Sequence, residues 1–461
     1  MQQRLTTPLY RAQTGRLRGN PTLPVDKTGI DAFQVSRVHP HNVTAFFKIK
    51  SAVCTEAKSE GKSVYNLAGT ENKNACQDSF EFLKLIGTGN FGKVYLAKNK
   101  FDNKVFAVKV LNKSKIRDPS RVLVERNVLV QTLKHPFLCQ LHYTFQSNTK
   151  LFFVIDYVNG GELFYHLSNE KRFNETKTRF YISEIACALG YLHSQNIIYR
   201  DLKTENVLLD SIGHIVLTDF GLCKQNFDSK DTTSTFCGSP EVRVINNYSI
   251  VGVFYTAPVQ VSWSREKRSL KPQVSVSASL DQDTWTGAAY LAPEVLRKES
   301  YDRTVDWWCV GIVTYEMLTG LPPFYSEDHQ KMYQSILYDN LNLPDYISSP
   351  AAMLIVGLLV KDAKLRLGSV DDLEEIKAQD FFASINFKKL EAREIQPPFK
   401  PNSNSELDTQ NISEEFTEMP ISQSVVQSYK RTQVLDPSYK KKNDNRFDGF
   451  TFVQGNILNT D

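Results

Sequence analysis

The chain has 461 residues, of which 41% are hydrophobic and 23% are charged, with a formal net charge of +4. This length exceeds one compact core and predicts two lobes plus tails, while the small net charge gives no argument for nucleic acid as a partner. The seven cysteines are scattered and contain no CxxC pair, which favours free thiols in a reducing compartment over a disulfide framework or a zinc site.

The N-terminal region, residues 1–79, is polar with little periodicity, and we predict it to be largely disordered. Its first 25 residues contain four arginines and no acid. A transit peptide has this pattern, but so does a disordered basic arm, which we prefer. No run of the chain approaches the ~20 apolar residues that a membrane helix needs.

Ordered structure is predicted from FEFLKLIGTGNFGKVYLAK (80–98), where alternating apolar residues flank a glycine cluster and indicate two strands joined by a flexible turn. KVFAVKVL (104–111) and LFFVIDYV (151–158) are further strands, and RVLVERNVLVQTL (121–133) has helical apolar spacing. These elements predict a small β-rich lobe.

The chain then becomes mainly helical, most clearly in FYISEIACALGYLHSQ (180–195). Short strands follow at VLLD (207–210) and IVLTDF (215–220), with helices from about 304 to 360. The end of the chain, from about 390, is rich in Pro, Ser, Asn and charge. The expected fold class is α+β, with a small β-rich lobe, a larger helical lobe and a tail.

The glycine cluster GTGNFGKV (87–94) has the pattern G-x-G-x-x-G-x-V, formed by Gly87, Gly89, Gly92 and Val94. Glycines let backbone N–H groups approach phosphate oxygens, although such patterns also occur in ordinary hairpins. Dinucleotide binding would require a helix directly after the glycines. A strand follows instead, which excludes a nucleotide-binding oxidoreductase.

A lysine and a glutamate follow the glycine cluster. Lys109, in FAVKVL, could pair with the α- and β-phosphates of ATP, whereas a lone lysine is more often a surface charge. Glu125, on the next helix, could hold Lys109 in place through an ion pair.

The most specific motifs are YRDLKTENVLLD (199–210) and TDFGLCK (218–224). Asp201 could accept the proton of an attacking hydroxyl, and Lys203 could neutralise the γ-phosphate. Asn206 and Asp219 could hold Mg²⁺. Any one of these residues could belong to an exposed turn, but four motifs in this order predict phosphoryl transfer from ATP with Mg²⁺.

From about residue 80 the chain resembles eukaryotic protein kinases of the AGC group, and most of all the serum- and glucocorticoid-regulated kinase (SGK) subfamily. The resemblance rests on the motifs YRDLKTEN, VLTDFGLCK, DTTSTFCG, YDRTVDWWCVG and GLPPFYS. It implies a bilobal kinase domain over 80–382 and an AGC C-terminal regulatory tail over 383–461. It also implies a monomeric serine/threonine kinase of the cytoplasm, and of the nucleus as a second compartment.

The resemblance assigns roles to matching residues. Substrates with arginines upstream of the target Ser or Thr (RxRxxS/T) are implied by three acids, Glu162, Glu205 and Glu316, of which Glu162 would also contact the ribose. The adenine site at the hinge would be lined by Ile155, Asp156 and Val158. A buried ion pair, Glu294–Arg366, and a brace of the catalytic loop, Asp306, complete the implied set.

Two phosphorylation sites are implied as well. Thr235 matches the activation-loop site, where Arg200 would be an unpaired positive charge until a phosphate arrives. The segment FDGFTF (447–452) resembles a hydrophobic motif, in which Phe447 and Phe450 dock beside the Glu125 helix and Thr451 is phosphorylated. The implied upstream enzymes are a phosphoinositide-dependent kinase and a TOR-containing kinase complex.

The chain departs from the family in its activation segment. Thr204 replaces a proline of the catalytic loop, and Ser239 replaces a threonine, but Ser239 keeps the hydroxyl that bonds the catalytic loop and positions substrate. In the family, the residue that matches Glu241 runs directly into the one that matches Tyr290, so residues 242–289 form an atypical insertion.

This insertion has two interpretations. We favour an alternatively spliced or wrongly predicted exon over a regulatory insertion. A long surface insertion costs only about 0.6 kcal/mol per doubling of length, so the fold should survive. A misplacement of ~1 Å in a positioning loop can cost about a hundredfold in rate, so the alternative function is a catalytically impaired, pseudokinase-like scaffold.

Overall fold

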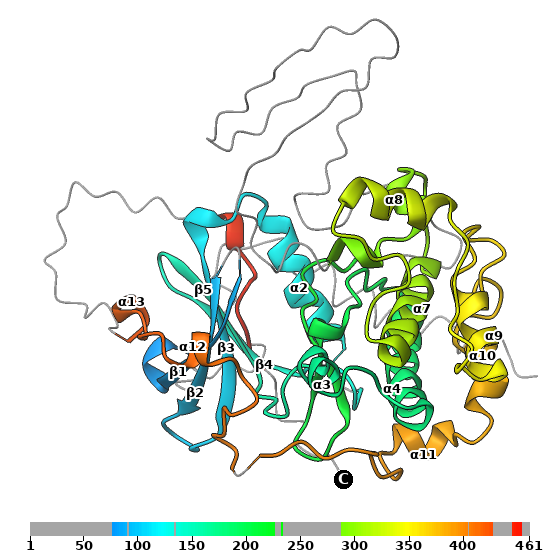
Figure 1. Ribbon diagram of the computed structural model, residues 1–461. Helices are drawn as coiled ribbons and strands as arrows, with labels where there is room; N and C mark the ends of the chain where they lie inside the picture. The colour runs from blue at the N-terminus through cyan, green and yellow to red at the C-terminus, as the bar shows by residue number, and fades with distance from the viewer. Residues whose placement is uncertain are drawn as a thin grey trace, which may run out of the picture. The chain divides into compact units, whose positions relative to one another are not determined.

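The computed structural model describes residues 76–89, 92–132, 135–225, 232–233, 287–403, 405–426 and 445–453. The predicted N-terminal region is therefore described only from residue 76, and residues 242–286 of the predicted insertion lie outside the described parts. The described residues form a sheet lobe and a helical lobe (Figure 1), which confirms the predicted bilobal α+β fold.

An antiparallel sheet in the order β1-β2-β3-β5-β4-β8 forms the small lobe. Its strands are β1 (Phe80–Gly89), β2 (Gly92–Asn99), β3 (Val105–Asn112), β4 (Leu141–Gln146), β5 (Lys150–Asp156) and β8 (Phe452–Val453). Gly89 faces Gly92 where β1 and β2 meet, and a Cβ at Gly92 would lie 2.1 Å from the carbonyl oxygen of Val110. Only glycine fits this position, because the neighbouring strand passes so close.

Helix α2 (Pro119–Gln131) belongs to the small lobe and carries Glu125. The carboxylate of Asp118 accepts the backbone N–H of Ser120 at 3.0 Å, and Pro119 occupies the first turn, where a missing N–H does no harm. The predicted helix over 121–133 therefore starts and ends two residues earlier than its apolar spacing indicated.

Two long helices form the centre of the large lobe (Figure 1), α4 (Glu175–Ser194) and α7 (Thr304–Thr319). Both are buried on nearly all sides, as a helix without a polar face must be. Around them lie α3 (Leu163–Glu170), α6 (Pro293–Leu296), α8 (His329–Tyr338), α9 (Ser349–Leu358), α10 (Asp372–Lys377) and α11 (Phe387–Glu391).

A short hairpin sets the geometry of the catalytic residues. Strand β6 (Val207–Leu209) pairs antiparallel with β7 (Ile215–Leu217), and the 3₁₀ helix η5 (Thr204–Asn206) precedes it. The backbone N–H of Thr218 donates to the carbonyl oxygen of Asn206 at 3.0 Å. This bond holds the loop that ends at Asn206 next to the loop that begins at Asp219.

The C-terminal tail returns to the small lobe (Figure 1). Helices α12 (Glu414–Thr417) and α13 (Gln423–Val426) lie against β1, and β8 pairs with β4. The remaining 3₁₀ helices are η3 (Gln77–Ser79), η4 (Lys113–Lys115), η6 (Gly287–Tyr290), η7 (Asp380–Phe382) and η8 (Asn445–Phe447). Among the described residues, no helix is long and apolar enough to cross a membrane.

Candidate active site

The glycine loop and Lys109 lie on adjoining strands. Gly87 faces Val94 across β1 and β2, and Val94 faces Lys109 across β2 and β3. The tip of the loop, residues 90–91, is outside the described residues. The loop backbone and the Lys109 side chain therefore start from the same level of the sheet.

Lys109 connects the two lobes. Its Nζ lies 2.7 Å from Oε1 of Glu125 and 3.3 Å from Oδ1 of Asp219. Burial alone would lower the pKa of Lys109, but the negative charges of Asp219 and Glu125 raise it above its usual value, while Lys109 lowers the pKa of Asp219. The amine is therefore charged and Asp219 is ionised at neutral pH.

Asp201 and Asn206 are joined directly. The amide nitrogen of Asn206 donates to the carbonyl oxygen of Asp201 at 2.7 Å and to its carboxylate at 2.8 Å. Burial raises the pKa of Asp201 to about 7, which the charge of Lys203 opposes and that of Asp219 reinforces. A carboxylate in this range suits a proton acceptor that works near neutral pH.

The donor set fits Mg²⁺. Because Asn206 uses its amide nitrogen on Asp201, its amide oxygen is the atom left to coordinate a cation, and Asp219 adds a carboxylate that is 51% exposed. Within the described ranges, no group of three or more His, Cys, Asp or Glu side chains forms a metal site. Mg²⁺ characteristically takes one or two protein oxygens together with substrate phosphates and water, as these residues would allow.

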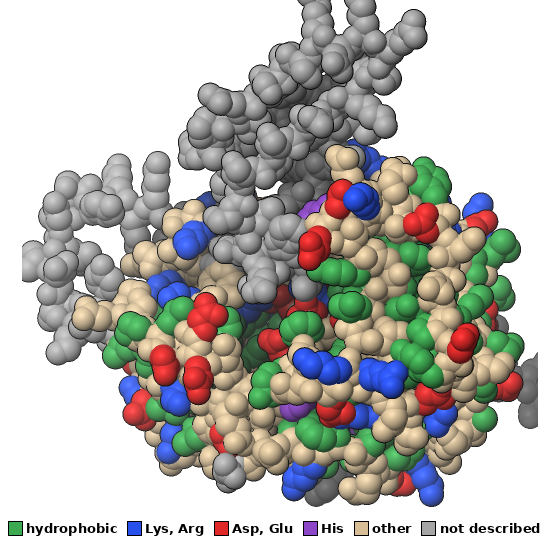
Figure 2. Space-filling view, in the orientation of Figure 1, with side chains coloured by type: hydrophobic (Ala, Val, Ile, Leu, Met, Phe, Trp, Pro, Cys, Tyr) green, Lys and Arg blue, Asp and Glu red, His purple; other side chains and the backbone are tan. Residues whose placement is uncertain are grey.

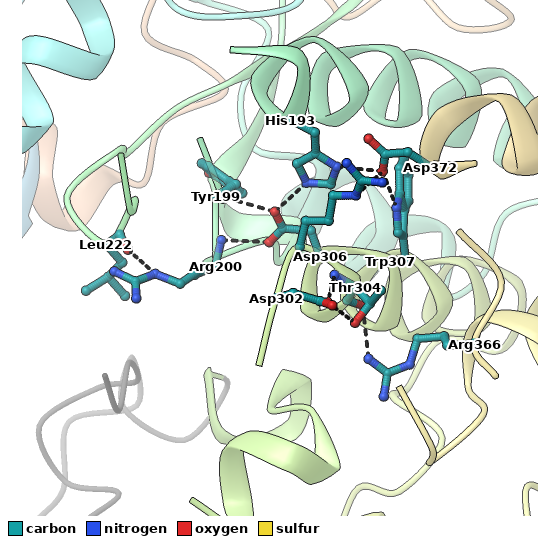
Figure 3. Close-up of polar contacts among 11 residues, drawn as sticks. His193, Tyr199, Arg200, Leu222, Asp302, Thr304, Asp306, Trp307, Arg366 and Asp372 are labelled. Carbon is teal, nitrogen blue, oxygen red and sulfur yellow. Dashed lines mark hydrogen bonds and ion pairs between the residues drawn. The ribbon is translucent and has the colours of Figure 1, made fainter. Parts of the chain in front are cut away.

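Asp306 of α7 holds the backbone that leads into Asp201 (Figure 3). One oxygen accepts the N–H of Tyr199 at 2.8 Å, and the other accepts the N–H of Arg200 at 2.7 Å. Arg200 has a φ of +67°, a left-handed conformation that is costly for a side chain with a Cβ. The carboxylate of Asp306 is fully buried and therefore fixes this strained turn directly before Asp201, the predicted proton acceptor.

Arg366 and Glu294 form the buried ion pair that the resemblance implied. Two guanidinium nitrogens of Arg366 contact the two carboxylate oxygens of Glu294 at 2.6 and 2.8 Å. Arg366 also donates to the carbonyl oxygens of Val360 and Thr304. This bidentate geometry joins α6 to the loop before α10.

Of the three acids expected to meet substrate arginines, Glu316 is the most enclosed. It is 4% exposed, and it accepts a hydrogen bond of 2.6 Å from the Tyr290 hydroxyl. Burial raises the pKa of Glu316 to about 8; the Tyr290 hydroxyl opposes this rise and the negative charge of Glu205 adds to it. Glu162 is exposed at the start of α3.

At the hinge, Ile155, Asp156 and Val158 are half-buried. The carboxylate of Asp156 already bonds His142 at 2.7 Å and the N–H of Gln140 at 3.0 Å. Any contact of Asp156 with adenine therefore falls to its backbone rather than to its side chain.

Among the described residues, Arg200 has no carboxylate partner, as expected of a charge that is unpaired before phosphorylation, but its guanidinium is hydrogen-bonded to neutral groups. Its guanidinium donates to the carbonyl oxygens of Leu222 at 2.7 Å and Cys223 at 3.3 Å, and to the Tyr301 hydroxyl at 3.0 Å. Since all three acceptors are uncharged, its positive charge is solvated but not neutralised by them. Tyr301 also pairs through its backbone with Thr233, while Thr235 lies outside the described residues.

The last residues of the predicted insertion, 287–289, belong to the large lobe in the structure. They form η6 with Tyr290, and Ala288 and Ala289 are almost fully buried. Gly287 lines a pocket together with Asp201, Lys203 and Tyr290. Ser239 and Glu241 lie outside the described residues, so their contact with the catalytic loop remains a prediction.

The two phenylalanines of the tail motif are fully buried in the small lobe. Phe450 packs edge-on against Phe153 at 5.1 Å between ring centroids, and its carbonyl oxygen accepts the Thr144 hydroxyl at 2.5 Å. Phe447 accepts a hydrogen bond from Gln146 through its carbonyl oxygen. Thr451 remains exposed next to these buried rings.

Several residues of the site were not found from the sequence. His193 and Asp372 extend the Asp306 brace, and the Tyr290 hydroxyl donates a hydrogen bond to Glu316. Their partners are distant in the chain, and a single histidine at a helix end has no motif of its own. The only local signal was the position of Tyr290 directly before LAPEV.

Comparison with known proteins gives the class of protein. The family model for the protein kinase domain matches residues 80–243 and 272–382, and the model for the protein kinase C terminal domain matches residues 404–452. The first match alone covers more than half of the chain and contains every motif of the catalytic cluster. The chain belongs to the protein kinase family.

Similar proteins then narrow the class to a subfamily. Serine/threonine-protein kinase Sgk1 of Danio rerio is 48% identical over 78% of this chain and 73% of its own length. The human Sgk1 is 47% identical over 84% and 79%, and sgk-1 of Caenorhabditis elegans is 43% identical over 87% and 75%. With the AGC tail in place, the protein is a serine/threonine kinase of the SGK subfamily that uses ATP and Mg²⁺.

Proposed function

We propose that this chain is an active kinase for proteins with arginines upstream of the target serine or threonine (RxRxxS/T). One observation carries the proposal: the Lys109–Asp219 contact, the Asp201–Asn206 bonds and the Asp306 brace are all formed. A protein that acts only as a scaffold would not need all three of these contacts. The tests below measure phosphate transfer, which a nucleotide-binding scaffold lacks.

The proposed division of labour follows the contacts. The substrate hydroxyl oxygen bonds to the γ-phosphorus of ATP while the bond from that phosphorus to the β-phosphate oxygen breaks and ADP leaves; Mg²⁺, when bound, would offset the phosphate charge. Asp201 accepts the proton of the substrate hydroxyl, and Lys203 neutralises charge beside it. Lys109 binds the α- and β-phosphates under the backbone of Gly87, Gly89 and Gly92. Asn206 and Asp219 would hold the metal ion.

The proposed preference for substrate arginines rests on the electrostatic repulsion between two carboxylates of the site. Glu205 and Glu316 are close enough for the charge of one to raise the pKa of the other. A guanidinium placed between them would relieve this repulsion and bond both carboxylates. Glu162 offers a third, exposed carboxylate for a second arginine or for the ribose.

Activation would use two phosphorylations. A phosphate on Thr235 would find the uncompensated charge of Arg200, because the nearby Thr233 already pairs with Tyr301, which contacts Arg200. A second phosphate would be placed on the exposed Thr451, which comes directly after the docked Phe450 in the chain. The proposed upstream enzymes are a phosphoinositide-dependent kinase and a TOR-containing complex, acting on a monomer in the cytoplasm or nucleus.

The second candidate, an impaired scaffold, is favoured by the activation segment. Either of two four-residue stretches could occupy the position directly before YLAPEV, namely GSPE (238–241) or TGAA (286–289). The structure has the second in that place, at least from Gly287 on. Gly287 offers no hydroxyl to the catalytic loop, whereas Ser239 does.

Two deletions of equal length separate the candidates. Removing 242–289 joins GSPE to Tyr290, whereas removing 238–285 keeps TGAA before Tyr290 and joins it to Cys237. Both, and the parent chain, are treated with the upstream kinase and assayed for phosphate transfer to an RxRxxS peptide. Similar rates for parent and the first deletion support the active kinase. Activity only in the first deletion means that the parent is a scaffold and that TGAA cannot replace GSPE.

A further inference from the structure

His193, in the last turn of α4, lies between two carboxylates (Figure 3). Its Nε2 is 2.8 Å from Oδ2 of Asp306, and its Nδ1 is 2.9 Å from Oδ1 of Asp372. An ionised carboxylate only accepts hydrogen bonds, so both ring nitrogens must carry a proton. With both carboxylates ionised, this geometry favours an imidazolium cation.

The surroundings of His193 support the cation. Its side chain and that of Asp306 are fully buried, while that of Asp372 is 19% exposed. Burial alone would lower the pKa of His193, but the bonds and charges of Asp306 and Asp372 raise it to about 9. The end of a helix also favours positive charge.

Asp372 is the outer support of this arrangement. It lies at the start of α10 and accepts the indole N–H of Trp307 at 2.8 Å, and Arg303 approaches it at 3.5 Å. The charged groups recorded around His193 are thus Asp306 of α7, Asp372 of α10 and, one contact further out, Arg303. The cation of His193 is shared between a carboxylate that holds the catalytic loop and one that does not.

We propose that Asp372 is a positioning residue for catalysis, which acts through the His193 cation on Asp306 and so on the backbone of Tyr199 and Arg200. The inference rests on the proposed kinase function and adds α10 to the machinery of the site. Without Asp372, the imidazolium loses one of two anionic partners and gives up its proton more easily. Neutral His193 binds Asp306 more weakly, and the turn before Asp201 loosens.

The test compares Asp372→Asn with Asp371→Asn in the full chain. The second variant removes the same charge one residue away, at an exposed position. For Asp372→Asn we expect kcat to fall about tenfold at pH 8, with the Kd for ATP within twofold of the parent. We also expect the ratio of kcat to that of Asp371→Asn to decline with rising pH between 6.5 and 8.5, because this ratio cancels the rise in kcat from ionisation of Asp201; in the parent, the decline comes only near pH 9. Asp371→Asn should match the parent.

A second variant, Arg303→Gln, tests the inference if the Asp372→Asn chain does not fold. Removing this cation from Asp372 strengthens the hold on the His193 proton, so the decline in kcat should move to higher pH than in the parent. A merely structural role would not shift two profiles in opposite directions.

Overlapping pH profiles for Asp372→Asn and Asp371→Asn would overturn the inference. For an Asp372→Asn chain that does not fold, an Arg303→Gln profile equal to that of the parent would overturn it. A parent that transfers no phosphate would overturn both the inference and the proposed function, and this outcome is recognised because Asp371→Asn is then inactive as well.

Discussion

Two acid–base clusters of this kinase are built from similar groups but differ in their access to water. In the cluster of Lys109, Glu125 and Asp219, the lysine side chain is 24% exposed and Asp219 is 51% exposed. In the cluster of Asp306 and His193, both side chains are 0% exposed. Figure 2 shows acidic and basic side chains in the hollow near the centre of this face of the molecule, and the exposed fractions show that Lys109 and Asp219 are reached by water.

The difference in exposure separates groups that can bind a ligand from groups that stabilise the backbone. An exposed ion pair contributes little to stability and can exchange its partner for a phosphate or a metal ion. A sealed pair cannot exchange partners without leaving a buried charge, and it therefore fixes the backbone around it. Removing a member of the open cluster should cost activity, whereas removing a member of a sealed pair should cost stability.

The largest effect is expected in the open cluster. Lys109→Met removes the cation for the phosphates, and peptide phosphorylation should fall by roughly a hundredfold or more, while the melting temperature stays within a few degrees of the parent. Radiolabelled phosphate transfer and thermal unfolding measure the two quantities. Lys104→Met, at an exposed position before β3, is the matched control and should leave both unchanged. Loss of fold together with activity in Lys109→Met would contradict the comparison.

The sealed pair Arg366–Glu294 should show the reverse. Glu294→Gln leaves a buried guanidinium without its anion, so the free energy of unfolding should fall by about 3 kcal/mol in denaturant titrations. Glu299→Gln, whose side chain is 56% exposed, should change it by less than about 0.5 kcal/mol. Equal stability of the two variants would mean that burial does not decide the role of these pairs.

The docked tail should have an intermediate effect on rate. Phe450→Ala empties a fully buried site next to Phe153, and the weaker docking should lower kcat by roughly tenfold to a hundredfold, because α2 and Glu125 lose their support. Asp448→Ala, at an exposed position between the two rings, is the control. A normal rate for Phe450→Ala would show that tail docking does not control α2.

The smallest expected effect is a pH dependence in substrate binding. Because the pKa of Glu316 is raised to about 8, its ionised fraction grows between pH 6.5 and 8.5. The KM for an arginine-containing peptide should therefore fall by about fivefold to tenfold over this range, as the carboxylate gains the charge that binds guanidinium. Glu316→Gln, or a peptide with its arginines replaced, should flatten the profile. A KM that rises with pH would reject Glu316 as an arginine ligand.

The sequence was most informative where chemistry and chain order coincide. Lys109, Asp201, Asn206 and Asp219 were recognised because each stands in a short motif whose local pattern fits its task. The tail was recognised from FDGFTF, but not the strand β8 that pairs it with β4, since two residues are too few for a periodic pattern. The neutral hydrogen-bond partners of Arg200 were not foreseen, because they are backbone carbonyls and a tyrosine 101 residues away.

By itself the sequence determined the α+β fold and the kinase family and predicted the reactive groups, because strand and helix periodicity and contiguous motifs are local properties of the chain. Only the tertiary structure decided how charges share their partners: that Glu316 accepts the Tyr290 hydroxyl, and that His193 joins Asp306 to Asp372. These contacts join residues up to 179 positions apart, and their energies depend on burial, which no local pattern records.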